Sequence, residues 1–367
     1  MMKIEDIQYL HLAYSLAEKA QGLTLPNPLV GALVVKEGKI VGHGYHQGPG
    51  LPHAEIVALQ MAGQQAAGAT LYVTLEPCVH WGKTPPCVET IVKTPLARIV
   101  ISAYDPNPLV YRKGVKYLRQ HGFQLDIGCL KEKNTQLNRA YYKFMSTRLP
   151  FVCLKVAASL DGKIATNTYS SQWISSRLSR DYSQLLRGEF QAIMVGIQTI
   201  IYDNPLLTVR HPQWPDKKIA RVILDSHLRF PPEAKMLTTL DQGPIIIFTT
   251  THAPSSHRKL LEEKGLQIVS FQPDSKGKVP IKATLEWLGR NQMASLLVEG
   301  GGELISSFLE EKLADKLILF LAPLLIGGKT APSFFPREGV TTIQEALRLE
   351  SISTFRLGND TIIEGYF

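Results

Sequence analysis

One histidine, two cysteines and a glutamate in the first quarter of the chain have the types and spacing of a hydrolytic metal site. His53-Ala54-Glu55 follows Pro52, and proline is favoured at the entry to a helix; Cys78 and Cys87 come later in the chain. An imidazole and two thiolates are a ligand set that zinc prefers, and three protein ligands leave a fourth position for water, which is typical of catalytic zinc. We therefore expect His53, Cys78 and Cys87 to bind one Zn²⁺.

Glu55 supplies the second part of this chemistry. Zinc lowers the pKa of a bound water toward roughly 7. A carboxylate that lies near the metal without binding it can take the proton of that water and deliver it to a leaving amine, and we assign this catalytic role to Glu55. Attack on an amidine-type ring carbon with loss of ammonia is the zinc deaminase reaction. By itself, a His beside a Glu is usually part of a helix cap. Two cysteines by themselves are usually small buried residues. The prediction of a metal site therefore depends on finding the histidine, the glutamate and the cysteines together.

Length and composition limit the classes of protein to which the chain can belong. The chain has 367 residues, which suggests two or three domains, and 44% hydrophobic with 20% charged residues is ordinary for a soluble globular protein. No apolar run approaches the about 20 residues that a membrane-spanning helix needs. Four cysteines do not form a disulfide framework, and the start of the chain, with Glu5 and Asp6, lacks a secretion signal. These features predict a cytoplasmic protein with no membrane partner.

The net charge of +8 is unevenly distributed. Residues 1–149 carry 16 Lys and Arg against 10 Asp and Glu. A basic excess favours anionic partners, which include nucleic acids and phosphorylated small molecules. No run of five basic residues occurs, so the sequence shows no nucleic-acid-binding arm.

Short β-like runs alternate with helical patterns through both halves, which predicts two layered α/β domains with largely buried sheets. The helix-like stretch 131–147 closes the first half and Pro150 interrupts the chain, so we place the domains at 1–148 and 149–367. Expected strands of the first domain are 31–35, 40–45, 70–75, 97–102 and 123–127. Its other expected helices are 8–20, 54–67, 87–94 and 115–121. Expected strands of the second domain are 151–158, 192–195, 221–225, 245–249, 295–299, 316–321 and 361–367. Its expected helices are 179–188, 257–264, 281–291 and 303–311.

The motifs of the first domain resemble a known family. His53-Ala54-Glu55 with Pro77-Cys78 is similar to the cytidine-deaminase-like superfamily, although that superfamily more often has two residues between its cysteines and this chain has eight. The longer segment Glu76–Cys87, together with Pro26–Ala32 and Asp105–Pro108, resembles the deaminase domain of the RibD family of bifunctional riboflavin-biosynthesis enzymes. The resemblance implies a three-layer α/β/α fold and deamination of a pyrimidinone that carries a phosphorylated ribosylamino group. By motif position it implies five substrate contacts: Asn27, His46, His80, Lys83 and Asn107. Both asparagines lie beside prolines, so each could instead satisfy the backbone of a turn.

The second domain resembles the reductase half of the same family. The segments 154–165, 170–174 and 203–210 carry this similarity, with the glycine turn of 296–304. Glycines between a strand and a helix allow backbone N–H groups to approach phosphate, although a glycine run is often only a turn. The resemblance implies a dihydrofolate-reductase-like α/β fold that uses NADPH to reduce the ribosyl side chain to ribityl. The implied NADPH contacts are Ala157, Trp173, Thr199, Asp203, Ser226, Gly301, Gly302, Glu303, Leu304, Ile305, Ser306 and Ser307. The implied substrate contacts are Lys155, Ser171, Arg187, Leu207, Arg210 and Glu299. One departure from the family pattern is the segment 166–170, which has Tyr169 and lacks an expected glycine.

Three interpretations of the whole chain follow. The first is a two-step riboflavin-biosynthesis enzyme with a zinc deaminase and an NADPH reductase, and the resemblance implies a homodimer or higher homo-oligomer without a nucleic-acid partner. The second is a deaminase that acts on a base in RNA or DNA, which leaves the second domain unexplained. The third is a non-catalytic module that binds a phosphorylated metabolite, for which Glu55 would be dispensable.

Overall fold

The structure is a computed structural model that describes residues 3–367. The chain divides into two compact units, Met1–Arg148 and Leu149–Phe367, which are described separately below. Within the described residues, no helix is both long enough and apolar enough to cross a membrane.

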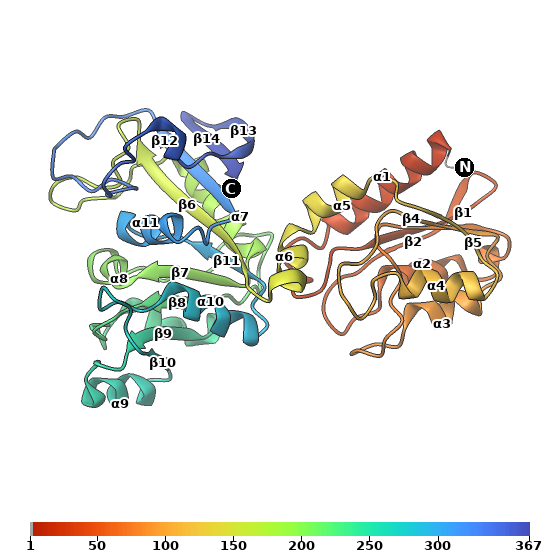
Figure 1. Cartoon of the computed structure of the whole chain (residues 1–367), viewed down its shortest axis with the longest axis horizontal. Helices are drawn as coiled ribbons and strands as arrows, with labels where there is room; N and C mark the ends of the chain where they lie inside the picture. Colours follow the sequence, from red (N-terminus) through yellow and green to blue (C-terminus); the bar gives the residue numbers. More distant parts are fainter. Residues whose placement is uncertain (1–2) are drawn as a thin grey trace. The chain divides into compact units, whose positions relative to one another are not determined.

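The first unit is built on a five-stranded sheet in the order β2-β1-β3-β4-β5 (Figure 1). Strand β1 pairs antiparallel with β2 and β3, whereas β3, β4 and β5 are parallel. The strands are β1 (Gly31–Lys36), β2 (Lys39–Tyr45), β3 (Thr70–Val73), β4 (Arg98–Ile101) and β5 (Gln124–Ile127). The helices are α1 (Ile4–Glu18), α2 (Ala54–Ala62), the 3₁₀ turn η1 (Gly63–Ala66), α3 (Cys87–Val92), α4 (Lys113–Gln120), α5 (Lys131–Leu137) and α6 (Arg139–Thr147).

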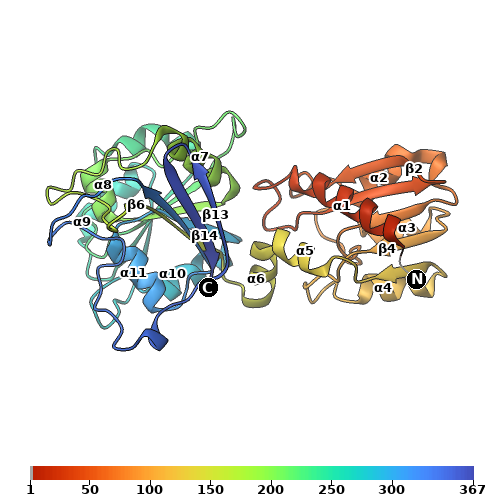
Figure 2. The same cartoon turned by 90° about the horizontal axis from the view of Figure 1, so that it is seen from above.

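Alternation along the strands divides this unit into three layers. Successive side chains of a strand point to opposite faces of the sheet. Ala32 and Val34 of β1 therefore pack with α2, α3 and α4, whereas Leu33 and Val35 pack against Leu10 and its neighbours on α1. In Figures 1 and 2, α1 and α5 lie on one side of the strands, with α2, α3 and α4 on the other. This is the three-layer α/β/α arrangement that the sequence predicts.

Two glycines of β2 seat the helix that carries the candidate catalytic residues. A Cβ atom at Gly42 would lie 2.2 Å from the carbonyl oxygen of Ala58, and one at Gly44 would lie 2.6 Å from that of Ala54. Only glycine therefore allows α2 to approach the sheet this closely. This close contact fixes the distance between the sheet and the start of α2, where His53 and Glu55 lie.

The second unit is built on a nine-stranded sheet in the order β10-β9-β8-β7-β11-β6-β12-β14-β13. The first seven strands in this order are parallel to one another, and β14 and β13 add an antiparallel hairpin at one edge. The strands are β6 (Phe151–Ser159), β7 (Ala192–Gly196), β8 (Ala220–Leu224), β9 (Ile245–Thr250), β10 (Gln267–Phe271), β11 (Ser295–Val298), β12 (Lys316–Ala322), β13 (Glu350–Leu357) and β14 (Asp360–Tyr366). The helices are α7 (Arg177–Glu189), α8 (Ile197–Asp203), η2 (Lys235–Gln242), α9 (Ser255–Glu263), α10 (Ile281–Arg290), α11 (Gly302–Glu310) and η3 (Ile343–Glu345).

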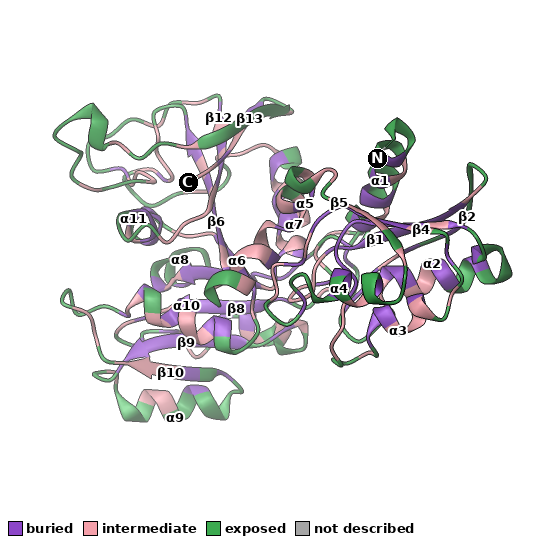
Figure 3. Cartoon of the chain, turned by 45° about the vertical axis from the view of Figure 1, so that its right-hand side comes forward, coloured by how far each residue is buried: buried purple, intermediate pink, exposed green. Residues whose placement is uncertain are grey.

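Helices cover both faces of this sheet. Helices α10 and α11 pack on one face, through residues such as Leu285 and Phe308. Helices α8 and α9 cover part of the other face through Ile200 and Leu261, and α7 covers the rest through Leu186. In Figure 3 the strands β8 and β9 are largely buried, whereas much of α9 is exposed. Strands that are buried on both faces read as continuous apolar runs, which explains why the sequence reveals them.

The structure corrects the predicted elements at four places. The predicted single helix 131–147 is wrong, because α5 ends at Leu137 and α6 begins at Arg139. Asn138 between them uses its side chain to accept the N–H of Leu29 at 2.7 Å and to donate to the oxygen of Leu29 at 3.1 Å. The elements α8, β10 and β13 are also absent from the prediction. Strand β13 is almost wholly exposed, so it has no burial pattern for periodicity to detect.

Two candidate active sites

The first site lies where two helices of unit one begin. His53 is the residue immediately before α2, Cys87 is the first residue of α3, and Cys78 lies in the loop after β3. The Nδ1 atom of His53 is 3.1 Å from Sγ of Cys87 and 3.5 Å from Sγ of Cys78, and one ligand atom from each residue falls within 4.8 Å of the others. The sequence predicts this set, and the structure brings all three residues together.

The chemistry of these donors fits zinc. The hydrogen bond between the two thiols and the contact with His53 lower the pKa of the Cys78 thiol, although burial opposes the shift. A thiol that deprotonates easily is a ready metal ligand. Thr84, which is not among the predicted residues, places Oγ1 3.3 Å from Nε2 of His53 and leaves Nδ1 facing the sulfur atoms. A hydrogen bond to the outer nitrogen of a histidine is the usual way in which a metal ligand is oriented.

Glu55 lies in the first turn of α2 beside this cluster, and its side chain is only 3% exposed. Burial raises the pKa of its carboxyl to about 7, against the opposing positive charge of His53. A carboxyl with a pKa near neutrality can both accept and release a proton at physiological pH. The position and the pKa of Glu55 therefore suit a general acid–base group rather than a permanently charged one.

His46 and Asn27, two predicted substrate contacts, lie next to the metal cluster. The rings of His46 and His53 are 5.0 Å apart in an edge-on arrangement. Nδ1 of His46 is 3.3 Å from the oxygen of Pro52, and Nε2 is 3.1 Å from the side-chain nitrogen of Asn27. Burial lowers the pKa of His46, which favours the neutral ring. Both side chains are thus fixed at the edge of the site.

The other three predicted contacts lie on loops around the same site. Nδ1 of His80 is buried and has no hydrogen-bond partner within residues 3–367, whereas Lys83 is exposed. Oδ1 of Asn107 accepts the N–H of Leu109 at 3.0 Å, which is the turn-forming role that the sequence left open for it. The side chain of Asn107 also hydrogen-bonds with Tyr141, so part of its hydrogen-bonding capacity is used within the protein.

Glu76 fixes the loop that carries Asn107, a role that is not predicted from its surroundings in the sequence. Its carboxylate accepts the backbone N–H groups of Arg112 at 2.9 Å and Val115 at 3.0 Å, at the start of α4. It also accepts the N–H of Asp105 at 3.4 Å. Because Glu76 is two residues before Cys78, it ties the metal-binding loop to the loop 105–112. In the sequence, a single Glu before a proline does not indicate that its carboxylate binds the backbone of a distant loop.

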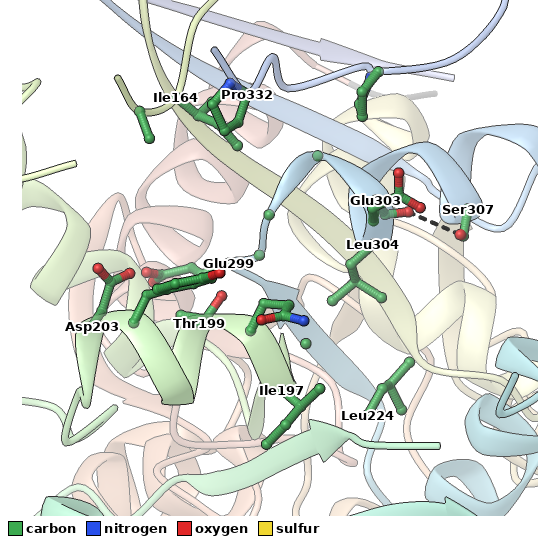
Figure 4. A pocket seen from close by; sticks show the side chains of 18 of the residues that line it. Ile164, Ile197, Thr199, Asp203, Leu224, Glu299, Glu303, Leu304, Ser307 and Pro332 are labelled. Carbon is green, nitrogen blue, oxygen red and sulfur yellow. Dashed lines mark hydrogen bonds between the residues drawn. The ribbon is translucent and has the colours of Figure 1, made fainter. Parts of the chain in front are cut away.

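The second site is a cavity of about 940 Å³ in unit two. It lies over the carboxyl ends of β6, β7, β8 and β11, where ligands of parallel sheets usually bind. The turn Gly300-Gly301-Gly302 leads from β11 into α11, and a Cβ atom at Gly301 would meet no other atom within 4 Å. Figure 4 shows Glu299, Thr199 and Asp203 on one side of the cavity and Glu303 and Ser307 at the start of α11 on the other. An open glycine turn at a helix N-terminus fits the phosphate groups of a dinucleotide.

A buried ion cluster lines this cavity next to the glycine turn, because its Glu299 directly precedes Gly300. Arg187 makes two hydrogen bonds of 2.9 Å to the carboxylate of Glu299. Burial raises the pKa of Glu299, but the positive charges of Arg187 and Lys155 outweigh it and lower the pKa to about 2. Burial lowers the pKa of Lys155. The cluster presents fixed charges of both signs to a ligand.

Most predicted contacts of the second unit line the cavity. The residues that do so are Lys155, Ala157, Ser171, Arg187, Thr199, Asp203, Leu207, Ser226, Glu299, Gly301, Gly302, Glu303, Leu304 and Ser307.

Four predicted contacts are not part of the cavity lining. Ile305 and Ser306 are completely buried behind the glycine turn. Trp173 is 67% exposed and packs against the guanidinium of Arg180, 4.4 Å from its ring centre. Arg210 donates to Oγ1 of Thr208 at 2.8 Å. Arg210 nevertheless lies near the ion cluster of the cavity, because its charge helps to lower the pKa of Glu299.

Two groups of residues that line this cavity are not among the contacts predicted from the sequence. A basic group, here called the basic rim, consists of His227, Arg229, Lys276 and Lys278. Scattered charges on two separate loops form no motif, so only the fold reveals them. Tyr169 and Tyr202 are the second group.

The fold and the two sites define a two-unit enzyme with a zinc deaminase unit and a reductase unit. Residues 3–103 match the family model for the cytidine and deoxycytidylate deaminase zinc-binding region, and residues 150–363 match that for the RibD C-terminal domain. The chain belongs to the RibD family of bifunctional riboflavin-biosynthesis enzymes. It is a deaminase and reductase whose cofactors are Zn²⁺ and NADPH, and its second unit has the dihydrofolate-reductase-like fold.

Similar proteins match along nearly the whole chain. The riboflavin biosynthesis protein RibD of Aquifex aeolicus is 42% identical and covers 99% of both chains. RibD of Escherichia coli is 38% identical over 88% of this chain and 89% of its own. The solved structure of Acinetobacter baumannii RibD has a TM-score of 0.87 at 36% identity, covering 99% of this chain and 98% of its own. A diaminohydroxyphosphoribosylaminopyrimidine deaminase/5-amino-6-(5-phosphoribosylamino)uracil reductase from Thermotoga maritima has a TM-score of 0.85 at 31% identity, covering 98% of each chain.

Proposed function

We propose that unit one converts 2,5-diamino-6-(5-phosphoribosylamino)pyrimidin-4(3H)-one to 5-amino-6-(5-phosphoribosylamino)uracil. Unit two then reduces this product to 5-amino-6-(5-phosphoribitylamino)uracil. The observation that carries the proposal is the convergence of His53, Cys78 and Cys87 beside the buried Glu55. The Thermotoga maritima relative is named for both reactions, which supports the choice of substrates.

In unit one, His53, Cys78 and Cys87 hold the metal and Glu55 moves the proton. Zinc, when bound, supplies the Lewis acidity that makes water nucleophilic near neutral pH. Glu55 would accept a proton from the attacking water and deliver it to the leaving amino group, a role that suits its buried position beside the metal ligands. Asn27, His46, His80 and Asn107 contact the ring, and Lys83 offers a point charge to the phosphate.

In unit two, the cavity binds the cofactor at one end and the sugar phosphate at the other. NADPH, when bound, supplies the reducing equivalents. The glycine turn and the first turn of α11 would hold its pyrophosphate, and the basic rim would hold its additional phosphate. Ser171, Lys155, Arg187, Leu207, Arg210 and Glu299 hold and orient the substrate, and Lys155 lies close enough to Glu299 to be influenced by its charge.

The protein works as a homo-oligomer in the cytoplasm. Strand β13 supports self-association, because it is an exposed edge of the nine-stranded sheet and such edges are usually covered. The four free cysteines, two of them needed as thiolates, support a reducing compartment. Light scattering of the purified chain should give a mass at least twice 40.8 kDa, and a monomer would contradict the assembly.

Mass spectrometry of the products tests both steps and their order. The zinc-loaded chain should convert the diaminopyrimidinone phosphoribosyl compound to the deaminated compound alone in the absence of NADPH. With NADPH present, the ribityl compound should accumulate instead. Recovery of unchanged substrate under both conditions would contradict the proposed substrate.

A further inference from the structure

Two tyrosines of unit two stack on each other at the rim of the reductase cavity. Tyr169 lies between β6 and α7, and Tyr202 lies on α8. Their ring centroids are 4.7 Å apart and their planes differ by 6°. Both side chains line the cavity, yet they are 51% and 54% exposed. A stacked pair that remains half exposed contributes little to the core, so its position at the cavity rim needs another explanation.

The backbone conformation at Tyr169 is one that favours glycine over tyrosine. Its φ of +63° lies in the left-handed region, where glycine is favoured and a tyrosine is strained. The turn around it is otherwise well satisfied. Thr166 accepts the N–H of Tyr169 at 2.9 Å, and the oxygen of Ser170 accepts the N–H of Thr166 at 3.0 Å. Glycine would therefore serve the turn better than tyrosine, whereas the ring contact with Tyr202 favours tyrosine here.

A hydrogen bond runs beside the stack between the same two segments. Oγ of Ser171 donates to Oδ1 of Asp203 at 3.1 Å, and both residues line the cavity. Ser171 follows Tyr169 by two positions, and Asp203, which is labelled in Figure 4, follows Tyr202 directly. The loop and α8 are thus joined by one aromatic contact and one polar contact. Ser171 and Asp203 are also the residues assigned above to substrate and to cofactor.

We propose that Tyr169 and Tyr202 form an aromatic latch that positions the reductase site. The latch holds the turn 166–170 against α8, so that Ser171 and Asp203 are already in place before the ligands bind. This role rests on the proposed reductase function of the cavity. A chain with an open latch has a smaller binding-competent fraction, and its apparent affinity falls in proportion to that fraction. The latch therefore acts on KM, and at saturating ligand kcat is preserved.

Five full-length variants test the latch: Tyr169→Gly, Tyr202→Ala, the double variant Tyr169→Gly/Tyr202→Ala, Tyr169→Phe and Tyr202→Phe. Reductase kinetics are measured with 5-amino-6-(5-phosphoribosylamino)uracil and NADPH. The two single truncations should each raise KM about 3- to 10-fold, with kcat within about twofold of the unaltered chain. The double variant should be no worse than either single one, because losing one ring already breaks the stack. The phenylalanine variants keep the stack and should behave like the unaltered chain.

The glycine variant separates the latch from a role in stability. Glycine relieves the strain at φ +63°, so Tyr169→Gly should unfold at the same temperature as the unaltered chain or a higher one. A raised KM in such a stable variant supports the latch. A KM equal to that of the unaltered chain, additive effects in the double variant, or phenylalanine variants as impaired as the truncations would each overturn it.

Amide hydrogen exchange gives a readout that does not need turnover. The latch predicts faster exchange of residues 166–171 in Tyr202→Ala than in Tyr202→Phe, in the absence of any ligand. Equal exchange in the two variants would overturn the latch. A failure of the unaltered chain to oxidise NADPH with the deaminated compound would instead overturn the reductase assignment, so the two failures are distinguishable.

Discussion

The Nδ1 atom of His53 lies 3.1 Å from Sγ of Cys87, although 34 residues separate them in the chain. Each residue stands at the beginning of a helix, His53 before α2 and Cys87 in the first turn of α3. The backbone at each helix start fixes where its ligand side chain begins, so the two helices set the distance between the imidazole and the thiol. The metal site is therefore assembled from the ends of regular elements rather than from flexible loops alone.

Thr84 should control the affinity of this site for zinc. Replacing Thr84 by Val removes the hydroxyl 3.3 Å from Nε2 of His53 and leaves the ring free to turn. We expect the zinc affinity to fall about 10- to 100-fold, measured by competition with a chelator. Thr94→Val is a matched control, because the Thr94 hydroxyl bonds only within its own helical turn, to the oxygen of Thr90 at 3.0 Å. Equal affinities of the Thr84 variant and the unaltered chain would show that His53 needs no such support.

The basic rim should select NADPH over NADH. NADPH carries one phosphate more than NADH. Lys276 and Lys278 line the cavity, and their exposed ammonium groups pair with Glu310 at 3.5 Å and Glu303 at 3.4 Å. The double variant Lys276→Ala/Lys278→Ala should raise KM for NADPH about 3- to 10-fold and leave KM for NADH nearly unchanged. The difference should shrink as salt is added. Lys259→Ala on α9, outside the cavity lining, is the control, and an equal loss for both cofactors would contradict the assignment.

The buried pair of Asp6 and Arg98 should make unit one sensitive to acid. Burial raises the pKa of the Asp6 carboxyl, but hydrogen bonds from Arg98, the Lys3 backbone and Tyr72 outweigh it and lower the pKa to about 2. An ordinary aspartate has a pKa of about 3.9. The stabilisation is therefore complete above about pH 4 and is lost as the pH falls toward 2.

Urea unfolding of Asp6→Asn measures this contribution. At pH 7 the variant should lose about 2–3 kcal/mol of unfolding free energy. The loss is no larger because Arg98 keeps Asp126 as a second partner. The difference from the unaltered chain should narrow between about pH 4 and about pH 2. Glu18→Ala, which removes an exposed pair with Lys133 at 4.0 Å, should change stability by less than about 0.5 kcal/mol. A constant difference across the pH range would contradict the low pKa of Asp6.

The sequence reveals most of the sheet because the strands are apolar on both faces. Continuous apolar runs identify β1 and β9, since such runs report burial on both faces of a strand. The same reasoning fails for β13, whose side chains are exposed. It also fails at Asn138, because the contact that interrupts the helix involves Leu29, a residue 109 positions away.

The metal ligands could be predicted from the sequence because zinc restricts the residue types and the motif restricts their order. Thr84, Glu76 and the basic rim could not be predicted, because each acts through a partner that only the fold brings near. The stack of Tyr169 on Tyr202 is of the same kind, although the missing glycine at 166–170 marked one of its members. Residues that bind the metal can be recognised from their types and order in the sequence, whereas the distant residues that hold them in place cannot.

The most direct test of the account is the zinc content and the deaminase rate of Glu55→Gln. Because Glu55 moves protons and does not bind the metal, the variant should retain one zinc per chain while its deaminase rate falls about 10²- to 10⁴-fold. Cys78→Ser is the matched comparison and should lose the metal, and both variants should still reduce the already deaminated compound with NADPH. Loss of zinc from Glu55→Gln, or deamination at the rate of the unaltered chain, would contradict the role assigned to this glutamate.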